Sequence, residues 1–139
     1  DHHLGRVLDA LKAAGQLENT VVIFSSDQGL AVGGRHGLMG KQNLYEHFKS
    51  PLVVAGPGVK PGKSDALVYL FDLFPTACDL AGVAAPTACE GASLVPVMTG
   101  EKAGVRDVLF AAYRDVQRMV RDDRWKLLWY PKAGRFQLF

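Results

Sequence analysis

The sequence predicts an α/β fold followed by a small antiparallel sheet. Two observations carry the α/β part: a helix-spaced segment at residues 3–14 leads into an apolar, β-branched run at 20–24, and a second apolar run follows at 51–55. The third observation is a change of pattern after Gly104, where short β-prone runs follow one another closely. With 139 residues and 48% hydrophobic side chains, the chain is long enough to build a core.

The first helix and strand form an αβ unit. Gly15 supplies a stop for the helix over 3–14, and residues 15–19 connect it to the run TVVIF at 20–24. This run reads as a fully buried strand that ends at Ser25, so Asp27 lies just beyond its end. Ligands of open α/β sheets bind at this edge, which makes Asp27 a candidate site residue. The apolar positions of the helix are Leu4, Val7, Leu8 and Leu11.

Further elements follow the run at 51–55, which turn-prone glycines and prolines close at 56–62. A short strand is expected at 67–69. Helical spacing over 71–81 predicts a helix with Asp72 as N-cap and Gly82 as stop. A shorter helical stretch, capped by Ser93, reaches Met98 before Gly100 ends it.

The C-terminal part predicts an antiparallel meander. Its β-prone runs are separated by turn-prone pairs such as Asp122-Asp123. We therefore expect residues 1–104 to belong to the α/β domain and 105–139 to a small antiparallel subdomain. The runs are Val108 to Tyr113, Gln117 to Arg121, Trp125 to Tyr130 and Phe136 to Phe139.

Composition excludes some classes of function. A net charge of +2 is too balanced for a nucleic-acid-binding footprint, and no apolar run approaches the ~20 residues that span a bilayer. Both ends, at Asp1 and Phe139, read as cuts in a longer protein. Cys78 and Cys89 could pair as a disulfide or remain free thiols. A basic cluster at 121–126 could bind an acidic substrate or form a solvated strand face.

Several motifs, taken together, carry a family resemblance. SSDQGL, HGLMGK, LYE and PLVVAGPG occur in this order, followed by LFDLFPTACDLAGV, EGASLVPVMTG, RDDRWKLLWY and FQLF. The chain resembles the C-terminal half of the type I sulfatases, members of the alkaline-phosphatase-like superfamily. The resemblance implies part of a mixed α/β sheet with helices, followed by a small C-terminal antiparallel sheet.

The resemblance also implies a nucleophile that this sequence does not contain. In the family a Cys or Ser within a C/S-x-P-S-R context is converted to formylglycine, and this residue belongs to the N-terminal half. The first pair of metal-binding aspartates belongs there too. The missing N-terminal half is therefore an expected partner, and the segment alone is expected to be inactive.

The resemblance makes four residues of this chain candidates for the family's site. Asp27 and Gln28 are expected to be oxygen ligands of a divalent cation, Ca²⁺ first, with Mg²⁺ and Mn²⁺ as alternatives. Gln28 stands where the family usually has Asn or His. Lys41 matches the lysine that contacts the sulfate, where a fixed ammonium stabilises developing negative charge. His36 is either a donor to the substrate or a turn residue.

The function that follows is the hydrolysis of a sulfate ester by the intact protein. A sulfated sugar is one candidate substrate. A phosphoesterase or phosphonate hydrolase of the same superfamily is an alternative, because the same cation and lysine can serve a phosphoryl group. A non-catalytic binding or interaction module is the alternative from a different class.

Overall fold

The computed structural model describes residues 1–29, 31–32, 39–40 and 49–139. Two-residue strands at 31–32 and 39–40 pair with each other, and the longer elements lie on either side of them. In the described part of the chain, every helix is too short or too polar to cross a membrane. The elements, with η for a 3-10 turn, are α1 (His2–Ala13), η1 (Leu17–Asn19), β1 (Val22–Ser25), β2 (Ala31–Val32), β3 (Met39–Gly40), β4 (Leu52–Ala55), η3 (Leu70–Asp72), α2 (Leu73–Leu80), α3 (Val95–Met98), β5 (Leu109–Tyr113), β6 (Gln117–Arg121), β7 (Lys126–Tyr130), η4 (Pro131–Ala133) and β8 (Arg135–Leu138).

Strands β1 and β4 form an antiparallel ladder, which confirms the two apolar runs as strands. The expected full burial of the first run is wrong. Phe24 is 47% exposed and Val53 is 58% exposed, and the two residues lie opposite each other across the ladder. They stay exposed because this ladder has two strands and no described element covers their face.

The turn after β4 passes close to the entry of β1. Gly56 has a φ of 141°, and a Cβ at this position would lie 2.7 Å from the carbonyl oxygen of Thr20 and 2.8 Å from the Cα of Val21. Both the backbone conformation and this close approach require glycine. The turn thereby fixes how β4 leaves the ladder.

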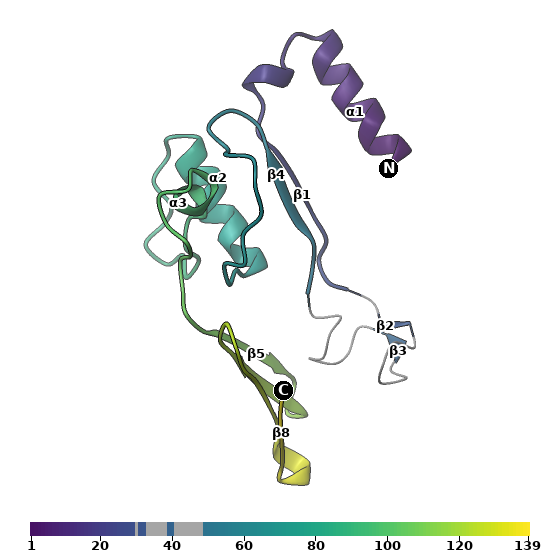
Figure 1. Ribbon diagram of the computed structural model, residues 1–139, viewed down its shortest axis with the longest axis vertical. Helices are drawn as coiled ribbons and strands as arrows, with labels where there is room; N and C mark the ends of the chain where they lie inside the picture. Colours follow the sequence, from purple (N-terminus) through teal and green to yellow (C-terminus); the bar gives the residue numbers. More distant parts are fainter. Residues whose placement is uncertain (30, 33–38, 41–48) are drawn as a thin grey trace.

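The helix predicted over 71–81 forms as η3 followed by α2, and Gly82 ends it with a φ of 67°. The short strand expected at 67–69 is wrong, because the Tyr69 amide donates to the Asp72 carboxylate instead of to a neighbouring strand. The predicted cap at Ser93 is wrong by one residue: α3 begins at Val95 with Leu94 as its N-cap, and the Ser93 hydroxyl, one position earlier, accepts the Val95 amide at 3.3 Å. Figure 1 shows α2 and α3 together beside the ladder.

The C-terminal residues form the expected antiparallel meander in the order β5-β6-β7-β8. Figure 1 shows this sheet at the opposite end of the molecule from α1. One face buries Met119 and Leu128 among other apolar side chains of the sheet. The opposite face carries an apolar groove of about 300 Å³, whose lining includes Phe110, Val120, Leu127, Trp129 and Phe136.

Candidate functional site

The end of β1 lies beside the start of β4. Ser25 is the register partner of Leu52, and its hydroxyl donates to the carbonyl oxygen of Pro51 at 2.8 Å. This hydrogen bond ties the exit of one strand to the entry of the other. The chain after Ser25 therefore leaves the ladder at a defined point, and Asp27 follows two residues later.

Asp27 and Gln28 form a short polar turn beyond this strand end. Asp27 is exposed and Gln28 is half-buried. The Asp27 Oδ1 accepts the Gln28 amide at 2.9 Å, and the Ser26 hydroxyl donates to the Gln28 carbonyl oxygen at 3.4 Å. Carboxylate and amide oxygens are the donors that hard cations such as Ca²⁺ prefer.

Two side chains alone cannot complete the ligand shell of such a cation. Ca²⁺ takes roughly 6–8 oxygen ligands, and within the described ranges no three His, Cys, Asp or Glu residues gather into a metal-binding group. A cation held by Asp27 and Gln28 would therefore need further ligands besides these two residues. Their role as ligands stays a prediction.

The remaining predicted site residues, His36 and Lys41, lie outside the described residues. Strand β3 ends at Gly40, which pairs with Ala31 of β2. In the sequence, Ala31 follows Asp27 by four positions and Lys41 directly follows Gly40. The roles of His36 and Lys41 also stay predictions.

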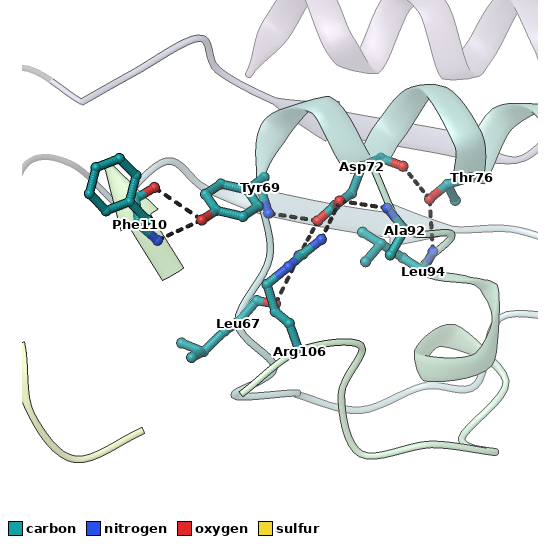
Figure 2. Close-up of polar contacts among 8 residues, drawn as sticks. All are labelled: Leu67, Tyr69, Asp72, Thr76, Ala92, Leu94, Arg106 and Phe110. Atoms are coloured by element: carbon teal, nitrogen blue, oxygen red, sulfur yellow. Dashed lines mark hydrogen bonds and ion pairs between the residues drawn. The ribbon is translucent and has the colours of Figure 1, made fainter. Parts of the chain in front are cut away.

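The most highly connected polar group in the described structure is the carboxylate of Asp72, which is fully buried (Figure 2). It accepts the Tyr69 amide at 2.7 Å, the Ala92 amide at 2.9 Å and the Arg106 Nη2 at 2.6 Å. The Arg106 Nη1 forms a further ion pair with the second carboxylate oxygen. This two-pronged geometry is characteristic of strong arginine–carboxylate pairs.

These contacts control the ionisation of Asp72. Burial by itself would raise the pKa of this carboxyl group, but the hydrogen bonds from Arg106 and from the Ala92 and Tyr69 amides outweigh it and hold the pKa below the ordinary value of 3.8. Asp72 is therefore charged at neutral pH. Because its acceptor sites are occupied by protein donors, we assign it a structural role.

Thr76 extends the same cluster by one helical turn. Its hydroxyl donates to the main-chain oxygen of Asp72 at 2.6 Å and accepts the Leu94 amide at 2.9 Å, and it is 1% exposed. A Cβ on Gly91 would lie 2.8 Å from the carbonyl oxygen of Phe71, so this segment packs directly on the helix start. The chain before α3 is thereby fixed to the first turn of α2.

Sequence reasoning identified Asp72 only as a helix cap. The assignment was half right: Asp72 immediately precedes α2, but its side chain caps η3 and pairs with Arg106. A carboxylate within the apolar stretch LFDLFP was a usable signal, since buried acids need partners. Arg106, 34 positions away, could not be found from spacing.

The cysteines and the basic cluster add little to the site. Cys78 and Cys89 are both free in the structure. In the basic cluster, Arg121 lies opposite Lys126 in register, and the Arg124 guanidinium lies 4.8 Å from the Trp125 ring centroid. This stacking orders the turn between β6 and β7 without requiring a ligand.

Comparison with known proteins identifies the class. The sulfatase family model matches residues 1–83, which include the whole strand-end segment. The N-acetylglucosamine-6-O-sulfatase of Bacteroides thetaiotaomicron is 37% identical over 116 residues, which are 81% of this chain and 21% of that protein. The chain therefore belongs to the sulfatase family, within the alkaline-phosphatase-like superfamily.

Solved structures agree with this class. A protein in complex with its substrate D-glucosamine-2-N,6-O-disulfate matches with a TM-score of 0.86 and 29% identity, over 99% of this chain and 31% of that one. The phosphonate monoester hydrolase of Silicibacter pomeroyi matches with a TM-score of 0.88 and 30% identity, over 99% of this chain and 32% of that one. This chain thus spans about a fifth to a third of the length of these relatives.

The Asp72 cluster predicts a large, pH-dependent effect on stability. Arg106→Met should lower the free energy of unfolding in urea by about 3–5 kcal/mol at pH 7, because a buried carboxylate loses its counter-charge. The pair stabilises the fold fully above the ordinary pKa of 3.8, and this contribution is lost as pH falls through the lower folded pKa. The difference between the two proteins should therefore shrink in acid.

Lys132→Met is the matched control, since the Lys132–Asp115 pair is exposed, with side chains 68% and 67% accessible. Such a pair contributes little to stability, because water screens both charges. Equal losses for the two variants, or a loss for Arg106→Met that does not change with pH, would contradict the account.

Proposed function

We propose that the protein containing this chain hydrolyses sulfate esters, R–O–SO₃⁻, to an alcohol and sulfate. The observation that carries the proposal is the sulfatase family match across residues 1–83, which includes the carboxylate and amide at the end of β1. Relatives that cover most of this chain are named sulfatases. The strand-end position of Asp27 and Gln28 suits a site at the edge of an α/β sheet.

Asp27 and Gln28 are the proposed cation ligands of this chain. Their oxygens suit Ca²⁺, with Mg²⁺ and Mn²⁺ as alternatives. A bound cation would polarise the sulfate oxygens. The glutamine side chain is one methylene longer than that of asparagine, so its amide oxygen reaches further from the backbone than an asparagine oxygen would. The main-chain N–H of Gln28 donates a hydrogen bond to Asp27 Oδ1 and thereby orients that carboxylate.

Lys41 and His36 are the proposed catalytic residues of this chain. Cleavage of the S–O bond places negative charge on the leaving oxygen and on the nonbridging oxygens. The Lys41 ammonium would neutralise part of this charge in the transition state. His36 would donate a hydrogen bond to the substrate or the leaving group.

The attacking group must come from elsewhere in the protein. The sequence contains no C/S-x-P-S-R motif from which formylglycine could be formed. We therefore propose that residues 1–139 alone do not turn over substrate. The segment would contribute charge stabilisation and part of the cation site to a larger active centre.

A sulfated sugar is the proposed substrate class. The bound ligand of one structural neighbour is a disulfated glucosamine, and one sequence relative is an N-acetylglucosamine-6-O-sulfatase. A second candidate activity is phosphonate monoester hydrolysis, which the neighbour from Silicibacter pomeroyi favours by its name and TM-score of 0.88. A cation and a lysine can serve either tetrahedral anion.

The direct test measures the intact protein on matched aryl esters. We expect kcat/KM for 4-nitrophenyl sulfate to exceed that for the corresponding phenylphosphonate ester by at least about 10²-fold, equivalent to ~2.7 kcal/mol of transition-state binding. The reverse preference would replace the proposal with the phosphonate activity. Binding of sulfated sugars without any turnover would favour a non-catalytic module.

Substitution of Lys41 tests the assigned catalytic role. Lys41→Ala should lower kcat by about 10²- to 10³-fold, or ~3–4 kcal/mol, if the ammonium acts mainly in the transition state. Lys41→Arg should restore activity only in part, because it returns the charge but not the shape. A loss confined to KM would indicate substrate anchoring instead.

The matched control is Lys49→Ala, which removes an exposed lysine of the same chain. Its kinetic constants should stay within about twofold of the unaltered protein, since exposed lysines are mostly solvated. If Lys41→Ala behaved like Lys49→Ala, Lys41 would be an ordinary loop residue.

A further inference from the structure

The outer edge of β5 is held by a side chain rather than by another strand. The Tyr69 hydroxyl accepts the Phe110 amide at 2.6 Å and donates to the Phe110 carbonyl oxygen at 3.0 Å (Figure 2). Strand β5 is a terminal strand of its sheet, with β6 on its other side. Tyr69 therefore satisfies both main-chain groups of Phe110, as a residue of a neighbouring strand would.

The Tyr69 ring is itself fixed from several directions. It stacks on Phe71 with ring centroids 4.5 Å apart, and the Arg106 guanidinium lies 4.6 Å from its centroid. Its main-chain amide donates to Asp72 at 2.7 Å. A tyrosine held in this way can position what its hydroxyl binds.

Arg106 anchors the segment that leads into β5. Residues 101–108 contain no helix or strand. Within them, Arg106 pairs with the buried Asp72, and its Nη1 also donates to the Leu67 carbonyl oxygen at 3.2 Å. The segment that leads into β5 is thus attached to the Asp72 carboxylate, which also binds the Tyr69 amide.

The apolar packing of the sheet lies mostly within the sheet. The residues packed against buried Met119 and Leu128 all belong to its own strands and strand ends. This packing stabilises the sheet internally but does not attach it to α2. The attachment described above is made by polar contacts.

We propose that Tyr69, Asp72 and Arg106 form a latch that docks the C-terminal sheet on the η3–α2 segment, and whose opening releases the sheet as an intact unit. The proposal does not depend on the sulfatase activity. In the closed latch, Asp72 fixes Arg106 and the Tyr69 amide, and the Tyr69 hydroxyl fixes β5. The latch can therefore be opened in two independent ways: by removing the Tyr69 hydroxyl, or by breaking the pairing of the Arg106 guanidinium with Asp72.

The test uses Tyr69→Phe and Arg106→Lys in the intact protein. Tyr69→Phe keeps the ring and removes both hydrogen bonds to Phe110, whereas Arg106→Lys keeps the charge but loses the two-pronged pairing. Either change should raise the hydrogen-exchange rate of the Phe110 amide about tenfold, the effect of losing roughly one hydrogen bond. Either should also speed proteolytic cleavage within residues 101–108, while amides of α2 and of Met119 keep their protection.

Tyr113→Phe is the matched control, because it makes the same chemical change in β5 itself. The Tyr113 ring packs against the buried Met119 and Leu128 of the sheet itself, so this variant should leave exchange at Phe110 and cleavage at 101–108 unchanged. Equal behaviour of Tyr69→Phe and Tyr113→Phe would overturn the latch. Loss of protection at Met119 in the latch variants would also overturn it, because the sheet would then unfold rather than undock.

Discussion

The buried carboxylate of Asp72 is the constraint on which the C-terminal half of the structure depends. A fully buried charge is tolerated only when it is paired and hydrogen-bonded, and Asp72 meets this requirement with Arg106 and two main-chain amides. The contacts that stabilise this one carboxylate therefore fix three chain segments: the turn before α2, the segment before α3 and the connection to β5. The lowered pKa of Asp72 reflects the same contacts.

The N-terminal half is organised differently. Its ladder of β1 and β4 leaves Phe24 and Val53 exposed, and the chain spans only part of the length of its relatives. Two hydrogen bonds define the end of β1: one from the Ser25 hydroxyl to the Pro51 carbonyl oxygen, and one from the Gln28 main-chain amide to the Asp27 carboxylate. The proposed cation site would combine this edge with residues from elsewhere in the protein.

Local patterns predicted most of the elements because periodicity and turn residues are local signals. The meander of β5–β8, the strands at 20–24 and 51–55 and the stop at Gly82 were all found in this way. Burial of the first strand was wrong, since covering layers are a property of the whole fold. The Asp72–Arg106 pair was missed because contacts between distant segments leave no spacing to read. For the site, sequence placed Asp27 at a strand end, while the roles of His36 and Lys41 stay predictions.

The most direct measurement of the central functional claim is a crystal structure of the intact protein with calcium and a sulfate ester, using anomalous scattering to locate the metal. The account predicts a cation whose distance to an Asp27 carboxylate oxygen is about 2.3–2.6 Å, with the Gln28 amide oxygen in the same coordination shell. Asp27→Asn should then lower both metal content and sulfate release. A metal bound away from Asp27, with content and rate unchanged in Asp27→Asn, would contradict the assignment of this strand end as the site.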